Sequence, residues 1–181
     1  MRRLAITGAQ GTGKSTMAQR AGEAARGLGI RAVVLEGIGA AVAAQGLPLG
    51  RQATAETFCA FAAAHLRRER LAEGELIVQD RCLLDLYAYC RVLGTAPYAT
   101  EFVAEATRLS LSENVTVSYL PLVNTLPPSQ STVEDSRFRQ AIAAEILVSA
   151  HALGIEVHVV DGTVDERVRR VLGILGITKQ P

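Results

Sequence analysis

The sequence predicts a three-layer α/β fold with a parallel β-sheet, and three observations lead to this prediction. Short apolar segments of strand length alternate with longer segments of helical periodicity along the 181 residues. A glycine-rich loop separates the first expected strand from the first expected helix. The strands are almost continuously apolar, as in a sheet covered by helices on both faces. Since helices connect the strands, we expect a single α/β domain over residues 1–181.

Local signals place each element in turn. Apolar runs give strands at residues 4–7, 31–36, 75–80, 115–120 and 155–160. Helices are expected at residues 14–28, 37–44, 53–73, 83–92, 99–111, 131–153 and 163–175. Gly74 and Gly154 end two of these helices, and Thr163 with Glu166 forms a capping box that begins the last one. Residues 121–130 contain three prolines and few helix formers, which predicts a loop.

Residues 8–15, with the sequence GAQGTGKS, fit the pattern G-x-x-x-x-G-K-[ST]. Glycines in such a loop let successive backbone N–H groups face phosphate oxygens, and the following helix adds the positive end of its dipole. Lys14 is then able to reach the β- and γ-phosphates of ATP, and the Ser15 hydroxyl can ligate Mg²⁺. The expected nucleotide-binding residues are Gly8, Gln10, Gly11, Thr12, Gly13, Lys14, Ser15 and Thr16.

Composition argues against several other kinds of protein. A net charge of +1 provides no overall field that would draw the chain to nucleic acid or to an anionic membrane. The three cysteines have no C-x-x-C spacing and the three histidines lie far apart, which argues against disulfides or a zinc site. The charged N-terminus does not resemble a signal peptide, and no apolar run approaches about 18 residues. We expect a cytoplasmic protein with reduced thiols and no membrane span, and leave a homodimer open.

Acidic residues follow three of the expected strands, at Glu36, Asp80 and Asp161. Because ligands bind at the carboxyl ends of parallel strands, such carboxylates can hold Mg²⁺ or accept a proton from a substrate hydroxyl. Asp80 is expected to hold Mg²⁺, whereas Asp161 is interpreted as a turn residue. The residue after Asp80 is Arg81, a cation that stabilises a transferring phosphoryl group but cannot activate water. This pair favours phosphoryl transfer to an acceptor over hydrolysis.

The chain resembles the P-loop kinases that include ribosylnicotinamide kinases and deoxynucleoside kinases. The resemblance is carried by the loop at residues 8–15, by Glu36, by Asp80-Arg81-x-x-x-Asp85-x-x-x-Tyr89 and by Asp135-x-Arg137. It implies a P-loop NTPase fold with a five-stranded parallel sheet of order 2-3-1-4-5, an acceptor region at about residues 37–74 and a lid at about residues 121–139. It also implies that Glu36 is the catalytic base. Deoxynucleoside kinases have Glu-Arg-Ser where this chain has Asp80-Arg81-Cys82.

Two groups of side chains in the expected acceptor region have a structural and a functional interpretation. Residues 58, 61 and 65, which are Phe, Phe and His, fall on one helical face; this indicates core packing and leaves base stacking as the alternative. The arginines at residues 67, 68 and 70 are interpreted as a solvated helix face rather than as a binding site.

The expected lid contains two arginines, Arg137 and Arg139. A spacing of two puts them on nearly opposite faces of a helix, so at most one of them should reach the γ-phosphate. We assign that role to Arg137, which matches the position of the family's lid arginine.

The leading prediction is an ATP- and Mg²⁺-dependent kinase that transfers the γ-phosphoryl group to a hydroxyl of a nucleoside- or nucleotide-like acceptor. The predicted catalytic residues are Lys14, Glu36, Asp80, Arg81 and Arg137, and the predicted metal ligands are Ser15 and Asp80. One alternative is a phage-type polynucleotide kinase for DNA modification, which phosphorylates a hydroxymethylated pyrimidine base and uses the arginines at residues 67–70 as backbone contacts. A second alternative is a nucleotide-dependent regulatory ATPase.

Overall fold

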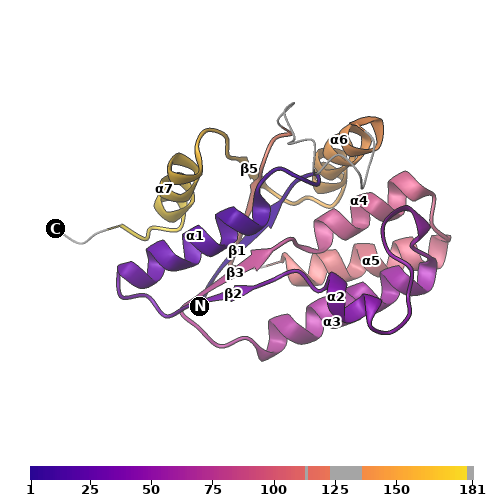
Figure 1. The fold of residues 1–181 in the computed structure, drawn as a ribbon, viewed down its shortest axis with the longest axis horizontal. Helices are drawn as coiled ribbons and strands as arrows, with labels where there is room; N and C mark the ends of the chain where they lie inside the picture. Colours follow the sequence, from indigo (N-terminus) through magenta and orange to yellow (C-terminus); the bar gives the residue numbers. More distant parts are fainter. Residues whose placement is uncertain (113, 123–135, 179–181) are drawn as a thin grey trace.

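The computed structural model describes residues 1–112, 114–122 and 136–178 of the chain. Its centre is a five-stranded sheet with the order β2-β3-β1-β4-β5, in which all neighbouring strands are parallel (Figure 1). The strands are β1 (Arg2–Thr7), β2 (Ala32–Leu35), β3 (Leu76–Asp80), β4 (Val115–Tyr119) and β5 (Val157–Val159). The predicted fold class and strand order are therefore confirmed.

Helices cover both faces of this sheet, as the apolar strands require. One face packs against α1 (Lys14–Gly27) and α7 (Val164–Ile174). The opposite side carries α3 (Ala55–Leu71), α4 (Leu83–Leu93), α5 (Pro97–Ser110) and α6 (Ser136–Ala152) (Figure 1). Between β2 and α3 the chain forms the short helix α2 (Gly39–Ala43), which was expected at residues 37–44, and then a 3₁₀ turn (Gly50–Gln52) that the sequence pattern did not indicate.

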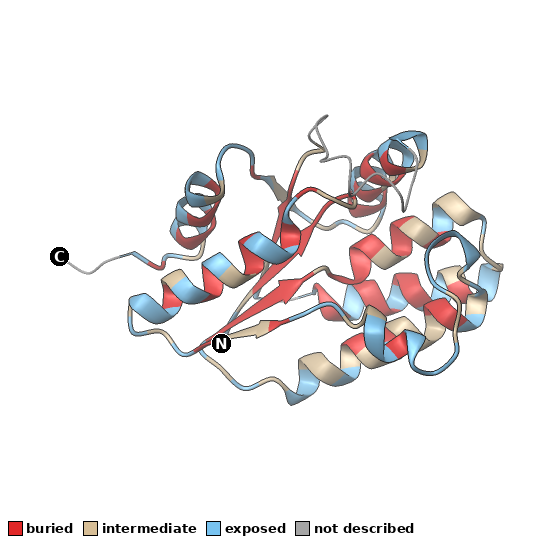
Figure 2. Ribbon diagram, viewed as in Figure 1, coloured by how far each residue is buried: buried red, intermediate tan, exposed pale blue. Residues whose placement is uncertain are grey.

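The core is divided by the sheet, because successive residues of a strand point to opposite faces. Leu4 and Ile6 of β1 belong to the cluster under α1 and α7, whereas Ala5 between them belongs to the cluster under α4 and α6. Figure 2 shows the resulting band of buried strands between helices whose outer faces are exposed. Because β1 contributes side chains to the core on both faces, the loop that follows β1 is held between the two helical layers.

The helix boundaries agree with the sequence pattern to within a few residues. Thr163 and Glu166 form the expected capping box of α7, with Glu166 N–H donating to Thr163 Oγ1 over 3.3 Å. Helix α6 is described from Ser136 onward, so most of the expected lid, residues 123–135, lies outside the described residues. Within the described ranges, no helix combines the length and apolar character that crossing a membrane would require.

Candidate active site

The phosphate loop between β1 and α1 has the conformation that its glycines predict. Gly8 has a φ of 149°, and a Cβ at this position would lie 2.7 Å from the Leu120 carbonyl oxygen at the end of β4. Any side chain there would collide with backbone, so the close approach of loop and strand requires glycine. Gly13 also has a positive φ and immediately precedes α1. The loop therefore presents its backbone at the carboxyl end of the sheet, where ligands are expected.

Lys14 is buried inside the curl of this loop. Its Nζ donates hydrogen bonds to the carbonyl oxygens of Gly8 and Ala9 over 2.7 and 2.6 Å. Burial, and then the neighbouring charge of Arg81, lower the pKa of Lys14 to about 8, although Asp85 and Asp80 oppose this shift. The ammonium group is thus held within the loop at a point where negative phosphate oxygens would stabilise its charged form.

Asp85 joins the phosphate loop to the turn between β3 and α4. One carboxylate oxygen accepts the backbone N–H of Gly8 over 3.3 Å, and the other accepts the N–H of Cys82 over 3.0 Å. Since both oxygens are used in this way, Asp85 is a positioning residue for the two segments. The pattern Asp80-x-x-x-x-Asp85 had singled out this residue, but the sequence did not indicate that it bonds the phosphate loop.

Asp80 is the last residue of β3, and Arg81 follows it directly. Asp80 is 7% exposed, and its Oδ1 has no hydrogen-bond partner among the described residues. Arg81 has a φ of 73°, a left-handed conformation that costs a non-glycine residue on the order of 1 kcal/mol or more. Both residues line the same cavity. The tight turn places a carboxylate and a guanidinium side by side at the end of the strand.

The side chains near the loop fit a magnesium ion. Mg²⁺ typically keeps several waters and uses one or two protein oxygens together with substrate phosphates. The orphaned Oδ1 of Asp80 and the exposed Ser15 at the start of α1 are suitable donors of this kind. Among the described residues, no group of three His, Cys, Asp or Glu side chains could hold a metal ion by itself. When bound, Mg²⁺ would neutralise charge on the β- and γ-phosphates.

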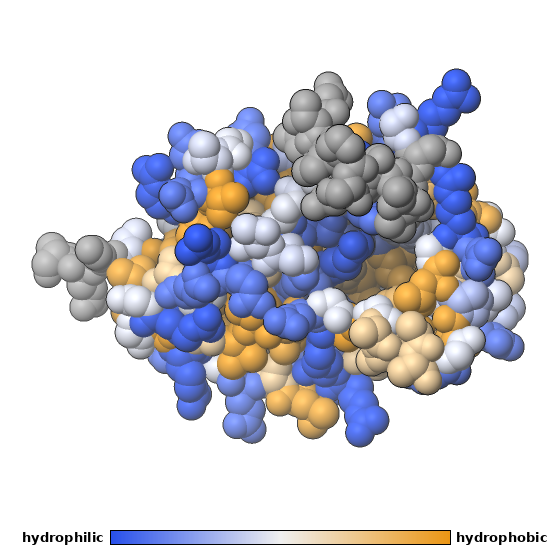
Figure 3. Space-filling view, viewed as in Figure 1, coloured by the Kyte–Doolittle hydropathy of each residue, from blue (hydrophilic) through white to orange (hydrophobic). Residues whose placement is uncertain are grey.

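A cavity of about 290 Å³ lies next to Asp80 and Arg81. Its apolar wall comes from the segment after β2 and from α3 and α4, through residues that include Ile38, Leu49, Phe58, Phe61, Leu86 and Tyr89. The space-filling view shows an apolar recess on this side of the molecule (Figure 3). Phe58 and His65 are buried, as core packing predicts, yet both also line the cavity together with Phe61.

The three neighbouring arginines of α3 do not form one solvated face. Arg67 and Arg70 are exposed, whereas Arg68 is half-buried and lines the cavity. Its Nη1 donates a hydrogen bond to the backbone carbonyl of Glu36. The interpretation as a solvated face is therefore wrong for Arg68, because α3 is rotated so that this residue faces the end of β2.

Glu36, the predicted base, has an exposed side chain. Its Oε1 accepts a hydrogen bond from Gln19 Nε2 of α1 over 2.9 Å. Glu36 lies beside the cavity rather than in its wall, which begins at the next residue, Gly37. Of the two acidic residues proposed for chemistry, Asp80 is the one whose side chain lines the cavity.

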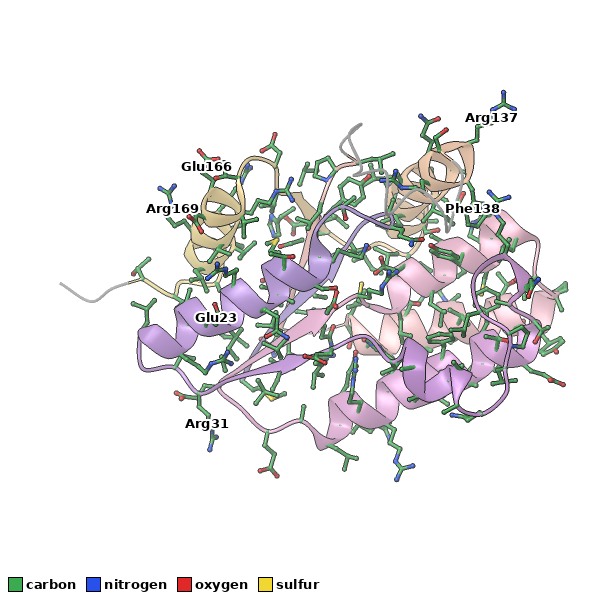
Figure 4. All side chains as sticks on the ribbon, viewed as in Figure 1. Glu23, Arg31, Arg137, Phe138, Glu166 and Arg169 are labelled. Carbon is green, nitrogen blue, oxygen red and sulfur yellow. The ribbon has the colours of Figure 1, made fainter. Side chains whose placement is uncertain are left out.

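Two arginines from the C-terminal half contact the phosphate loop. Arg139 of α6 donates from Nε to the Gln10 carbonyl over 3.0 Å, and Arg167 of α7 donates from Nη1 to the Thr12 carbonyl over 3.1 Å. Both side chains are more than nine-tenths buried. By contrast, Arg137 is exposed and extends outward from α6 (Figure 4). The structure thus places Arg139, and not the favoured Arg137, at the nucleotide side of the site.

A buried ionic cluster anchors α3 to the sheet below the cavity. Glu69 of α3 lies 2.7 Å from Arg3 Nη2 of β1 and 2.9 Å from His65 Nε2. It also accepts hydrogen bonds from Gln79 Nε2 and Ser110 Oγ, each over 2.7 Å. Because two charge contacts and two hydrogen bonds converge on the Glu69 carboxylate, the helix that carries His65 and Arg68 is held in one rotation against the sheet.

Comparison with known proteins shows the class of fold to which this chain belongs. The fold is similar to that of NadR protein in complex with NR (TM-score 0.77, 13% identity), with 99% of this chain and 52% of that chain covered. It is also similar to a deoxyadenosine kinase from M. mycoides (TM-score 0.63, 16% identity), with 97% and 100% covered. Mycobacterium tuberculosis APS kinase CysC matches at a TM-score of 0.51 and 15% identity, with 97% and 96% covered. The chain spans about half the length of NadR.

These likenesses define a P-loop kinase fold with the phosphate loop after the first strand. A family model described as an AAA domain matches residues 3–167, and the chain belongs to this family. The resemblance to the small P-loop kinases inferred from the motifs is confirmed. No curated protein matches the chain by sequence.

Proposed function

We propose that this chain is a kinase that uses ATP and Mg²⁺ to phosphorylate a hydroxyl group of a nucleoside-like small molecule. The observation that supports this most directly is the cavity of about 290 Å³ whose wall contains Asp80, Arg81 and Gln10 of the phosphate loop. A molecule in this cavity would present its hydroxyl beside the γ-phosphate. The kinase fold of its structural neighbours is consistent with this function.

The reaction would form a bond between the acceptor oxygen and the γ-phosphorus and break the bond from that phosphorus to the β–γ bridging oxygen, so that ADP leaves. The hydroxyl proton would pass to a carboxylate, either Glu36 as the resemblance implies or Asp80. Lys14 and Arg81 would stabilise negative charge on the transferring group. Most of the acceleration would come from positioning and electrostatics, since little covalent chemistry falls to the protein.

A small-molecule acceptor is favoured over a base in DNA by the position of the arginines. The polynucleotide kinase alternative used the arginines of α3 as one cluster of backbone contacts. Arg68 instead faces the cavity, and the exposed Arg67 and Arg70 do not line it. The regulatory ATPase alternative is disfavoured because Arg81, rather than a carboxylate, follows Asp80.

The test is phosphoryl transfer from radiolabelled ATP with Mg²⁺ to a panel of nucleosides, nucleotides, ribosylnicotinamide and hydroxymethylated DNA. We expect label on a nucleoside-like small molecule and none with Lys14→Ala. Label on DNA alone would support the polynucleotide kinase, and release of phosphate without any labelled acceptor would support the ATPase.

A further inference from the structure

Arg167 ties the last helix of the fold to the phosphate loop. Its Nη1 donates a hydrogen bond to the backbone carbonyl of Thr12 over 3.1 Å, across 155 positions of sequence. The side chain is 9% exposed, and its Nε is buried without a hydrogen-bond partner among the described residues. Within the same described ranges, no carboxylate forms an ion pair with it. Because a buried charge without a counter-charge costs free energy, the residue is a candidate for a functional role.

The position of Arg167 follows from the way α7 begins and packs. A Cβ at Gly162 would lie 2.8 Å from the Glu166 carboxylate that caps α7, so glycine is required where the helix begins. Val164 and Val171 pack in the core cluster that α7 shares with α1, which lies beside it (Figure 1). Arg167 is three positions after the first valine and four before the second, so it shares their helical face. Its side chain is therefore directed toward the start of α1, where the phosphate loop ends.

The hydrogen bond to the Thr12 carbonyl also sets the direction of the next N–H group. In a planar trans peptide, the carbonyl and the N–H that follows it point in opposite directions. Since the Thr12 carbonyl faces Arg167, the Gly13 N–H is turned away from α7. Gly13 is the N-cap of α1, and no side chain of the described residues caps this helix. The N–H groups at this point are thus available to phosphate oxygens.

Other carbonyls of the loop are held by a group that nucleotide binding would displace. Lys14 occupies the carbonyls of Gly8 and Ala9, and it would exchange these bonds for the phosphates of a nucleotide. Arg167 approaches from α7, outside the loop, so its bond to Thr12 can persist when a nucleotide is bound. A peptide unit that is oriented before binding costs no reordering when the phosphates arrive.

We propose that Arg167 is a positioning residue for nucleotide binding, which holds the Thr12 carbonyl and thereby keeps the Gly13 N–H directed at the phosphates. This inference rests on the proposed function only through nucleotide binding. Backbone N–H groups of such a loop cradle the α- and β-phosphates, which ADP and ATP have in common. Arg167 should therefore serve both nucleotides equally. A cation that acts on the transferring γ-phosphoryl group would instead favour ATP and raise kcat.

The experiment measures the Kd of MgADP and MgATP by calorimetry, and kcat and KM with the best acceptor, for the wild type and Arg167→Met. We expect both nucleotides to bind more weakly by the same factor, about 10- to 100-fold, which is the range for one hydrogen bond to a charged group. At saturating MgATP, kcat should change by no more than about threefold. Arg167→Lys should recover most of the affinity, because an ammonium group can also donate to the carbonyl.

Arg169→Met is the matched control, because Arg169 is exposed and extends outward from the same helix (Figure 4). Its Kd values should equal those of the wild type. Urea unfolding shows whether each variant is folded. If Arg167→Met is not, Arg167→Gln takes its place, since the glutamine amide ends short of the carbonyl. Failure of both to fold would make Arg167 a packing residue and overturn the inference.

Three other results would also overturn the role of Arg167. These are unchanged affinity in Arg167→Met, a loss confined to MgATP or to kcat, and a loss that Arg167→Lys does not recover. Each of them leaves the proposed function standing, because the wild type still binds nucleotide and transfers phosphate. A wild-type protein that binds neither MgADP nor MgATP would overturn the proposed function together with this inference.

Discussion

Arg139 and Gln10 are 129 positions apart in the sequence, and the Nε of Arg139 donates a hydrogen bond to the Gln10 carbonyl over 3.0 Å. This contact fastens the first turns of α6 to the phosphate loop. The Nη2 of Arg139 is buried and has no hydrogen-bond partner among the described residues. A guanidinium with a spare donor at this point is well placed to meet the phosphates of a bound nucleotide.

We therefore expect Arg139→Ala to lower kcat on the order of 10²-fold or more, because a cation near the transferring phosphoryl group is lost. Arg137→Ala is the matched comparison, since that residue lies two positions away on the exposed side of α6. Measuring kcat for both variants by steady-state kinetics shows which of the two arginines acts on the transferring phosphoryl group. If Arg137→Ala instead carries the loss and Arg139→Ala is nearly active, the original assignment to Arg137 is correct and α6 must present another face during turnover.

The sequence was sufficient to predict the strands, the phosphate loop and the position of Asp80 and Arg81, because these depend on local pattern and on the rule that ligands bind at strand ends. It was not sufficient to assign the arginines of α3 and α6. Helical periodicity shows which residues share a face but not how the helix is rotated against the sheet. For α3 that rotation depends on Glu69 meeting Arg3, a contact between residues 66 positions apart.

A second prediction concerns the pH dependence of nucleotide binding through Lys14, whose pKa is lowered to about 8 by burial and by the charge of Arg81. Bound phosphates favour the charged lysine, so affinity for MgATP should fall as pH rises through about 8, by up to about tenfold per pH unit. Calorimetry at pH values from 6.5 to 9.5 (roughly the range that brackets this pKa) measures the effect. Lys14→Met should bind weakly and show a flatter profile.

The same residue gives a prediction for the free energy of unfolding. Because the folded pKa of Lys14 lies below its ordinary value of 10.5, the unfolded chain binds more protons between about pH 8 and 10.5, and the free energy of unfolding should rise with pH across that window. Lys14→Met should lack this rise in urea titrations.

Lys14→Ala should abolish turnover while the fold is kept. If the variant retained more than about a tenth of wild-type kcat, which is a barrier change of only about 1.4 kcal/mol, the phosphate-binding role of Lys14 would be contradicted.

The buried cluster around Glu69 predicts a different pH dependence. Burial alone would raise the pKa of Glu69, but hydrogen bonds from His65 and Ser110 and the charges of His65 and Arg3 lower it below 4.5. The stability that this carboxylate contributes should be complete above its ordinary pKa and be lost as pH falls through the folded value. Glu69→Gln should thus reduce the free energy of unfolding by about 3 kcal/mol at pH 7.

That difference between Glu69→Gln and the wild type should shrink in acid, where the wild-type carboxyl is itself protonated. Glu73→Gln provides the control, because this residue is exposed near the end of the same helix. Urea denaturation of the three proteins at pH 7 and near pH 3.5 (about one unit below the ordinary pKa) provides the measurement. A constant difference at both pH values would show that the carboxylate charge is not what stabilises the cluster.

The last prediction separates Glu36 from Asp80, the two carboxylates that could accept the hydroxyl proton. If Glu36 is the base, Glu36→Gln keeps the hydrogen bond with Gln19 but cannot take the proton, so kcat should fall about 10²-fold while affinity for MgATP is unchanged. Asp80→Asn should instead weaken the metal site, and part of its loss should return at high Mg²⁺.

Kinetics of both variants across a Mg²⁺ titration distinguish the two roles. The exposed side chain of Glu36 must reach the cavity to act, whereas Asp80 already lines it with an unpartnered oxygen. Normal turnover in Glu36→Gln, together with a loss in Asp80→Asn that no Mg²⁺ concentration restores, would therefore move the base to Asp80. Asp85 is a poor candidate for the base in either case, because the backbone amides of Gly8 and Cys82 occupy both of its oxygens.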